Sequence, residues 1–456
     1  MKGKDNFEYM TARPVPQTIC ELAVPTIISM LVSAIYNVAD TYFVGRIDTQ
    51  STAAIGISFS AMSVVQAFGF FFGHGSGNYI SRMLGARKTG HAETMATIGL
   101  FSSFLAGTLI AVAGLIFLTP VCRALGSTDT ILPYAREYLG IILIGTPFMA
   151  ASLTLNNQIR FKGNAKYAMI GIISGALINI IMDPILIFTF DMGVKGAAIA
   201  TISGQIIGFA ALLLIDRRTG SFSVSFKAFK PTVKAYVEII KGGLPSLLRQ
   251  GLLSISTILL NVAAKEYGDS AIAGMAITTR IIYILNAIVI GLGQGYQPLC
   301  GFNYGARLYG RVMDGFWFCV KAGTLFFLTC SILGYIFAPE AVAIFRKEDA
   351  MVISIGAEAL RWQLIALPFG AFTLVSNMML QTIRKAGRAA LLASARQGLF
   401  FIPCILVLPH LIGIRGVEMT QAIADILSFA LALPLTLSTL KEMNRLSKGC
   451  TGVQSH

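Results

Sequence analysis

The chain has 456 residues, of which 55% are hydrophobic and only 13% are charged, and its mean hydropathy is +0.71. A soluble protein carries about a quarter charged residues, so this composition excludes a soluble chain and predicts a polytopic membrane protein. The formal net charge of +14 comes from basic residues clustered in short loops between apolar stretches. That placement is typical of membrane topology rather than of nucleic-acid binding, and we expect no nucleic-acid partner.

Twelve apolar segments are long enough to cross a lipid bilayer, which takes about 20 residues of helix. A segment in lipid must satisfy its backbone hydrogen bonds internally, so we expect an all-α bundle. The predicted spans are 17–41, 52–81, 93–118, 131–154, 165–189, 195–215, 235–262, 270–300, 313–337, 350–380, 389–411 and 416–438.

The first span has a proline in its first half and polar residues in its second half. Pro25 removes a backbone donor, so we consider it a hinge. Tyr36 and Asp40 are four residues apart and therefore share one face of the helix. For Asp40 the simpler alternative, an acid at the outer membrane surface, stays open.

The second and eighth spans carry the glycine clusters Gly73-His-Gly-Ser-Gly77 and Gly291-Leu-Gly-Gln-Gly295. Neither follows a strand, and GxxxxGK[ST] does not occur, so nucleotide binding is not expected. We interpret the clusters as close helix packing or hinge points, and His74 as a hydrogen-bonded core residue. The seven cysteines lack any CxxC spacing and the four histidines are scattered, which indicates no metal site and no cofactor.

The fifth span contains Asn179 and Asp183, which share one face, and Pro184 directly after the acid. The proline should bend or loosen the helix beside Asp183. A carboxyl in hydrocarbon costs roughly 3 kcal/mol on insertion scales, so Asp183 should face protein or a wet cavity. We predict a proton or cation site here, and structural hydrogen bonding beside the proline is the alternative.

Further polar residues of the first half could complete one pocket around these two acids. Two acids buried together repel each other, so at least one would take up a proton near neutral pH. The predicted ion-coupling group is Tyr36, Asp40, Tyr138, Asn156, Asn179, Asp183 and Thr201. Candidates for lining a substrate cavity are Asn37, Met149, Arg249, Tyr283 and Asn377, and Arg249 and Arg280 are the deepest cations of the second half.

The second half repeats the first at an offset near 220. Leu22-Ala-Val-Pro25 matches Gly242-Gly-Leu-Pro245, and Gly85-Ala-Arg87 matches Gly305-Ala-Arg307. Six spans per half is an even number, so the two halves should have the same orientation and enclose a central cleft. The expected organisation is an N-terminal segment 1–16, an N-lobe 17–215, a linker 216–234, a C-lobe 235–438 and a C-terminal tail 439–456.

The loops on one side of the predicted topology hold 23 lysines and arginines, and those on the other hold 7. Basic residues accumulate on the cytoplasmic side, so we expect both termini to be cytoplasmic.

The residues around Asp183 carry a family resemblance. Asn179-Ile-Ile-Met-Asp183-Pro184 followed by Gly193-Val-Lys-Gly196, together with Pro25, Tyr36, Asp40 and the paired Gly-Ala-Arg loops, resembles the multidrug and toxic compound extrusion (MATE) family over nearly the whole chain. The likeness is greatest to the bacterial branch of DinF- and MepA-like exporters. It implies a V-shaped fold of two six-helix lobes in the bacterial inner membrane, with the N-lobe polar cluster named above.

The resemblance further implies export of organic cations or amphipathic drugs in exchange for H⁺ or Na⁺, without enzymatic activity. The NorM-like branch carries acids on its seventh and tenth spans, where this chain has Arg249, Gln250 and Asn377. A cation site in the C-lobe is therefore not expected, which concentrates coupling in the N-lobe.

Other functions were weighed against an antiporter that works by alternating access. A flippase for a lipid-linked or lipid-like substrate would use Arg249 and Arg280 in the cleft. An intramembrane aspartyl protease is disfavoured, because Asp40 follows Ala39 and Asp183 follows Met182 instead of the residues of YD and GxGD motifs. A passive channel would not need the repeat and the buried acids. No interface is evident in the sequence, so a monomer is the default expectation.

Overall fold

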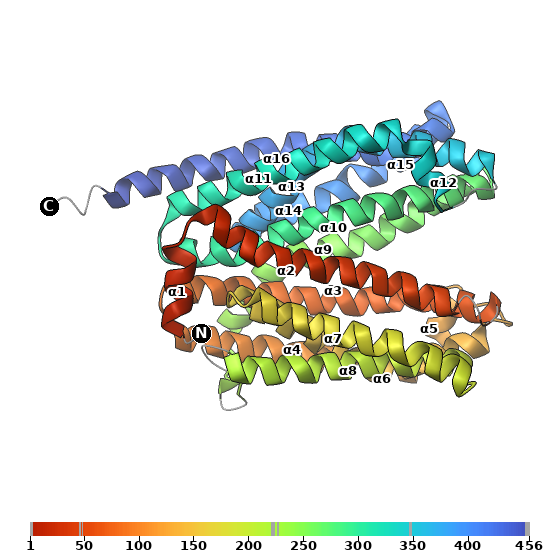
Figure 1. Ribbon diagram of the computed structural model, residues 1–456, viewed down its shortest axis with the longest axis horizontal. Coiled ribbons are helices and arrows are strands. Elements are labelled where there is room, and N and C mark those ends of the chain that lie inside the picture. Colours follow the sequence, from red (N-terminus) through yellow and green to blue (C-terminus); the bar gives the residue numbers. More distant parts are fainter. Residues whose placement is uncertain are drawn as a thin grey trace.

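The computed structural model of the chain is a bundle of long helices that lie nearly parallel to one another (Figure 1). It describes residues 3–44, 47, 49–219, 224–225, 228–345 and 349–451, and the side chains of residues 3–5, 36–42, 44, 49, 219 and 449–451 lie outside that description. Within these ranges twelve helices are long and apolar enough to cross a membrane. The predicted all-α fold with twelve spans is confirmed.

The first six spans form the N-lobe. Its helices are α2 (Val15–Val44), α3 (Thr49–Gly85), α4 (Thr89–Ile116), α6 (Leu132–Phe161), α7 (Ala165–Pro184) and α8 (Gly193–Thr219). A short α1 (Gly3–Thr11) precedes them, and α5 (Leu118–Ala124) follows the third span. Directly after Pro184 the fifth span changes to a π-helix, η1 (Ile185–Thr189), so the predicted loosening beside Asp183 is confirmed.

The C-lobe repeats this plan. Its long helices are α9 (Val233–Lys265), α10 (Asp269–Gly305), α11 (Tyr309–Ile336), α13 (Ala350–Thr382) and α16 (Ile414–Thr451). The eleventh span consists of α14 (Ala386–Ser394), the π-helix η3 (Ala395–Leu399) and α15 (Phe401–Ile412). The short α12 (Ala338–Ala343) follows the third span of this lobe, as α5 does in the other.

Backbone details reproduce the sequence repeat. Arg87 and Arg307, the last residues of the paired Gly-Ala-Arg loops, both adopt left-handed backbone with φ of 58° and 63°. That region is unfavourable for a residue with a side chain, so its occurrence at both positions indicates that the two lobes contain the same turn. Asn156 donates to the carbonyl of Ala168 at 2.7 Å, and its counterpart Asn377 donates to that of Ala389 at 2.7 Å. Residues that match in sequence at the offset of 221 therefore also make equivalent contacts in the structure.

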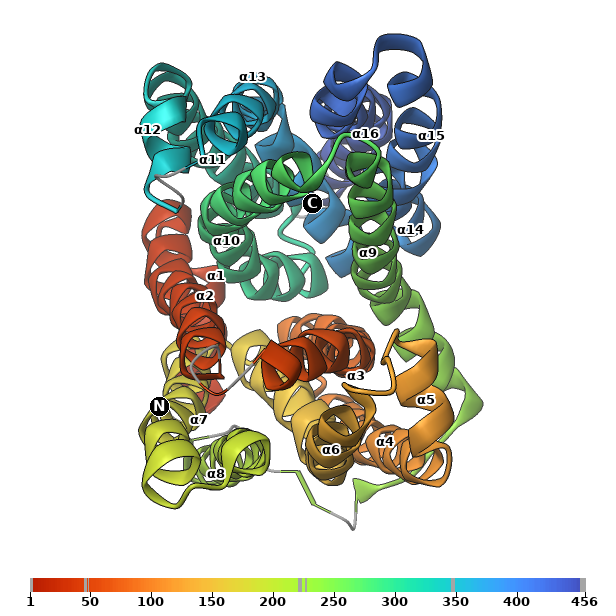
Figure 2. The ribbon, with the colours of Figure 1, turned by 90° about the vertical axis from the view of Figure 1, so that its right-hand side faces the viewer.

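The two lobes lie side by side, with α3 and α10 facing each other between them (Figure 2). On the two flanks of this junction, α2 packs against α10 and α9 packs against α3. Both chain ends and the connection from α8 to α9 lie at one end of the bundle, here called the termini end (Figure 1). The short helices α5 and α12 lie at the other, the far end.

The outward faces of the lobes are apolar and exposed. On α4, for example, Leu105, Leu109, Val112 and Ile116 are all at least half exposed. Such a surface is stable in contact with lipid tails and not with water. At the termini end, one buried cluster that includes Ile19, Ile80, Tyr296 and Phe316 joins residues of both lobes.

An ion pair is buried at the termini end of the N-lobe. The Nζ atom of Lys162 lies 2.7 Å from Oδ1 of Asp216, and both side chains are almost completely inaccessible. Burial lowers the pKa of Lys162, and the charge and hydrogen bond of Asp216 oppose that effect. Asp216 also accepts from the backbone N–H of Val224, so this pair fixes the start of the connection to the C-lobe.

We expect Lys162→Met to lower the free energy of unfolding by about 3–5 kcal/mol, because it leaves the Asp216 carboxylate buried without its counter-charge. Replacing both residues, as Lys162→Met with Asp216→Leu, should restore most of this loss. The matched control is Lys195→Met, which removes a half-exposed pair with Glu137 and should cost less than about 1 kcal/mol. Thermal unfolding in detergent measures all three, and equal effects of Lys162→Met and Lys195→Met would contradict the expectation.

Candidate functional site at the junction of the lobes

Glycines allow the two lobes to approach within backbone contact. A Cβ atom at Gly75 of α3 would collide with the carbonyl of Ile239 on α9, and one at Gly295 of α10 would collide with the backbone of Ala23 on α2. At the end of the same helices, Gly85 meets the carbonyl of Phe302. The glycine clusters of the second and eighth spans are therefore packing positions at the junction, and not loops.

These close contacts lie in the half of the junction nearer the termini end. They involve the last third of α3 and α10 and the first third of α2 and α9. The helix α1 reinforces this closure, because Asn6 donates to the carbonyl of Lys162 in the N-lobe while Asn303 of the C-lobe donates to that of Met10. In this conformation the lobes are thus closed at the termini end.

A charged network crosses the closed end. Arg82 of α3 donates to the carbonyl of Thr382 on α13 at 2.6 Å and lies 3.3 Å from a carboxylate oxygen of Glu238 on α9. Glu238 also binds Arg384, and the Thr382 hydroxyl donates to Asn78 of α3 at 2.9 Å. Because Arg82 and Asn78 belong to one lobe and their partners to the other, this network must break when the lobes separate here. We call it the closed-end lock.

A second polar cluster lies deeper, around Arg160 of α6. Its guanidinium donates to Oδ1 of Asn157 at 2.7 Å, lies 3.4 Å from Nε2 of His74 and donates across the junction to Gln294 of α10. The ring of His74 is held by the carbonyl of Phe70, so it is a hydrogen-bonded core residue as predicted. Sequence analysis placed Arg160 among the loop residues, whereas it is only 3% exposed inside the bundle.

The N-lobe acid Asp183 is fully buried, and the Asn179 amide lies between it and Thr201. With its NH₂ group toward the acid, Asn179 donates to Oδ2 of Asp183 at 2.9 Å and accepts from the N–H of Thr201 at 3.1 Å. This orientation pairs each donor with an acceptor, so we adopt it. Tyr138 packs nearby, in a buried cluster with Ile187 and Ala197.

Asn156 does not join this group. It binds the carbonyl of Ala168, which precedes Asp183 by four turns of α7, or about 22 Å along the axis. The expectation of one pocket containing all seven residues is therefore wrong for Asn156, whose bond instead holds α6 to α7. The side chains of Tyr36, Asn37 and Asp40 lie outside the described residues.

The remaining predicted cavity residues are dispersed. Met149 packs inside the N-lobe against Val65 and Ala150, and Asn377 is buried by its bond to α14. Tyr283 is exposed. Arg249 is partly exposed, and its charge acts on both Arg160 and His74 across the junction. Of the four candidates whose side chains are described, Arg249 is therefore the one that the structure places at the lobe junction.

Comparison with known proteins agrees with this architecture. The family model described as MatE matches residues 25–185 and 245–407, one segment in each lobe. The chain belongs to the MatE family. It is 30% identical over 440 residues to the multidrug export protein MepA of Staphylococcus haemolyticus, with 96% of each chain covered, and 28% identical to MepA of Staphylococcus aureus.

Solved MATE structures share the fold of this MatE chain. A MATE crystal structure in complex with MaL6 superposes with a TM-score of 0.91 at 24% identity, covering 96% of this chain and 99% of the other. A MATE family multidrug resistance transporter in an outward-facing conformation gives 0.90 at 24% identity, covering 98% and 99%. The chain is thus a membrane transporter with the two-lobed MATE fold that the resemblance implied.

The C-lobe of this MatE chain also contains buried acids, but they have different surroundings. Asp425 of α16 forms two bonds with Arg396 of η3, at 2.6 and 3.1 Å, and accepts from Gln421 at 2.8 Å. A guanidinium neutralises this carboxylate, whereas the Asn179 amide donates to Asp183 without adding a charge. The Asp425 carboxylate is thus held in an ion pair with Arg396.

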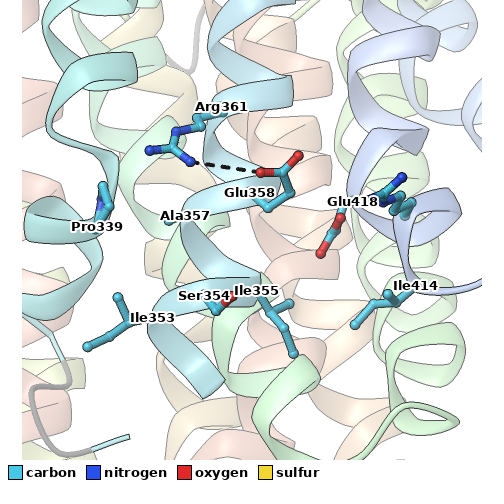
Figure 3. Close-up of a pocket in the computed structure, with 10 residues that line it drawn as sticks. Pro339, Ile353, Ser354, Ile355, Ala357, Glu358, Arg361, Ile414 and Glu418 are labelled. Carbon is cyan, nitrogen blue, oxygen red and sulfur yellow. Dashed lines mark ion pairs between the residues drawn. The ribbon is translucent and has the colours of Figure 1, made fainter. Parts of the chain in front are cut away.

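Another buried acid, Glu418, is not among the residues that the sequence singles out. It lies at a pocket of about 510 Å³ at the far end, together with Glu358, Arg361 and Arg415 (Figure 3). Its Oε2 atom has no hydrogen-bond partner among the described residues. All lining residues belong to α12, α13, α16 and their ends, so the pocket lies within the C-lobe and not at the junction. An acid one turn into an apolar span was the signal available in the sequence.

Glu238→Gln should destabilise the closed-end lock, because it removes the charge that holds both Arg82 and Arg384. Charged hydrogen bonds are worth about 1.5–3 kcal/mol, so the population open at the termini end should rise about 10- to 100-fold. A cysteine introduced at Ser81, which is buried against Gly301 of the other lobe, reports the opening through its rate of maleimide labelling. The exposed Thr89→Cys is the control and should label equally in both backgrounds.

Unchanged labelling of the cysteine at position 81 in the Glu238→Gln background would show that the glycine contacts, and not the ion pairs, keep the lobes closed.

Proposed function

We propose that this protein is a secondary active exporter of organic cations or amphipathic drugs, driven by the inward flow of H⁺ or Na⁺ through alternating access. Its relatives over the full length are named multidrug export proteins. The single observation that carries the coupling mechanism is the complete burial of Asp183 inside the N-lobe, where the Asn179 amide donates to it and the helix loosens directly after Pro184.

A carboxyl buried in this way can exchange a proton or a cation during the cycle. Ionised Asp183 carries a charge into a low-dielectric interior, and uptake of H⁺ or Na⁺ removes that penalty. Its location next to the π-helix η1 favours a mechanical response, because π-turns mark places where a helix changes register at functional sites. Asp40 and the hinge at Pro25 would supply the second acid and the bending helix of the same lobe.

In the proposed cycle, the far end of the junction opens while the closed-end lock holds the termini end shut. Ion binding at Asp183 and Asp40 releases the drug outward, the lobes rock, and the lock opens to admit the next drug. One charge moved across 100 mV supplies about 2.3 kcal/mol, or roughly fifty-fold accumulation. Export of a monovalent cation therefore needs more than one ion per cycle to draw on the membrane potential.

The alternative is a flippase for a lipid-linked or lipid-like molecule. A flippase was expected to use Arg249 and Arg280 together in the cleft. The position of Arg280 does not support this function, since Arg280 is exposed and the described residues give it no bond to Arg249. Increased resistance to drugs on expression would support the exporter, and unchanged resistance combined with a defect in a lipid-linked product would support the flippase.

Asp183→Asn should fold and insert normally yet lose ion-driven export, because an amide can hydrogen-bond to Asn179 but cannot bind a proton. In vesicles of purified protein, a gradient of one pH unit should concentrate a fluorescent cation about tenfold for each coupled proton, and about onefold in the variant. A sodium gradient imposed separately identifies the coupling ion. Accumulation at the wild-type level by Asp183→Asn would refute the coupling role.

The matched control for that experiment is Asp425→Asn in the C-lobe. It leaves the partly buried Arg396 without its partner, so we expect a lower unfolding temperature. Its dependence on the ion gradient should remain that of the wild type, since Asp425 takes no part in coupling.

We further propose that the termini end faces the cytoplasm of a bacterial cell, because the basic loops lie at that end. A green fluorescent protein fused after Leu446 should then fluoresce, and alkaline phosphatase fused there should be inactive. Phosphatase inserted at Gly126, in the turn before α6 at the far end, should be active, since this enzyme needs oxidising conditions to form its disulfides. The opposite pattern would invert the topology.

A further inference from the structure

Most of the buried and partly buried cations in the described part of the chain are paired with an acid. Lys162 has Asp216, Arg82 has Glu238, and Arg396 has Asp425. Arg160 is equally buried, but its described partners are Asn157, His74 and Gln294, which bring no negative charge. Among the described residues, neither Arg160 nor Arg249 has an ion-pair partner.

The guanidinium of Arg160 also has a donor to spare. Its Nε–H is buried and has no acceptor among the described residues. Arg249 comes from the opposite lobe, at the middle of α9, and is partly exposed. The two cations act on each other across the junction, and this repulsion adds to the cost of burial. A buried charge without a counter-ion is strongly unfavourable, so the arrangement is suited to hold an anion.

The N-lobe acids are too distant to serve as the missing counter-ion. Gln294 precedes Gly295, which packs on Ala23 of α2, so the Arg160 cluster lies at the level of Ala23. Asp40 follows Ala23 by almost five helical turns, or about 25 Å. Asp183 ends α7 at the far end, whereas Arg160 ends α6 at the termini end. The nearest lock acid, Glu238, is already bound by two arginines.

We propose that Arg160 and Arg249, one from each lobe, form a subsite for the anionic group of the exported molecule, a carboxylate on a zwitterionic amphipath. The inference rests on the proposed export function and names a substrate class for it. A guanidinium binds a carboxylate through two parallel hydrogen bonds, and the free Nε–H of Arg160 with one terminal N–H supplies that geometry. Nε–H and Nη2–H lie on the same side of the guanidinium, so a carboxylate there would replace Asn157 as the acceptor of Nη2–H, while Nη1–H keeps its bond to Gln294 of the other lobe.

The sequence repeat supports a specialised role for this cluster. The C-lobe counterpart of Arg160 is Gln381, which donates to Ser246 and to the carbonyl of Gly242 in its own lobe. The counterpart of His74 is Gln294. At the equivalent positions of the C-lobe, uncharged amides thus fill the space and make the hydrogen bonds. Helix packing alone therefore does not require a guanidinium at position 160.

The test uses a rhodamine dye with a free carboxylate and its methyl ester, which differ only in that charge. Fluorescence polarisation measures binding of each to the purified protein in detergent, so the result does not depend on transport. Wild-type protein should prefer the free acid. Arg160→Gln and Arg249→Gln should each weaken binding of the free acid about 10- to 100-fold and leave binding of the ester within about twofold. The control is Arg280→Gln, an exposed arginine of α10, which should change neither.

Absence of a preference in the wild-type protein, or a ratio that Arg249→Gln leaves unchanged, would overturn the proposal. Arg249 makes no hydrogen bond among the described residues, so its replacement tests the site even if Arg160→Gln fails to fold. A lipid phosphate has the same chemistry: displacement of a bound anionic lipid with no preference between the dyes would assign the arginines to lipid and overturn the substrate role. Selective binding without any ion-driven transport would support the subsite and contradict the proposed export function.

Discussion

Compensation of buried charge is the constraint on which this structure depends. In water an isolated lysine or aspartate costs little, but inside a membrane each one must find a partner, a cavity or a ligand. The chain satisfies this requirement at the ends and in the C-lobe with ion pairs: Lys162 with Asp216, Arg82 with Glu238, and Arg396 with Asp425. These pairs fix the frame. The places where a transported ion or molecule can act are then the buried Asp183 carboxyl and the pair Arg160 and Arg249, which have no ion-pair partner among the described residues.

The duplicated architecture makes this distinction visible. Where the two lobes carry the same structural residue at equivalent positions, the contacts are also the same. Asn156 and Asn377, for example, bind equivalent carbonyls of the following helix. Where function departs from structure, the copies differ. Arg160 and His74 correspond to the amides Gln381 and Gln294. Comparing the two lobes therefore distinguishes structural residues, which are the same in both copies, from functional residues, which differ. This comparison needs no other protein.

Sequence reasoning found the twelve spans because helical periodicity is not needed to recognise about 20 consecutive apolar residues. The spans observed begin within a few residues of those predicted, and the loosened helix after Pro184 follows from the missing backbone donor. The site was harder. Asn179, Asp183 and Thr201 came together because two of them share a helix face, but Asn156 did not, since nothing in its sequence position gives the height at which α6 meets α7.

Arg160 shows most clearly what a sequence alone cannot give. It stands two residues before Lys162 in a basic run at the end of a span, which is the usual appearance of a cytoplasmic loop. In the structure α6 continues through that run to Phe161, and long side chains on a helix point back toward its N-terminus, which here carries the guanidinium into the bundle. The helix thus extends beyond the predicted end of the span at residue 154, and it places Arg160 inside the bundle instead of in a cytoplasmic loop. Only the packing of α10 against the N-lobe shows that the charge faces the other lobe.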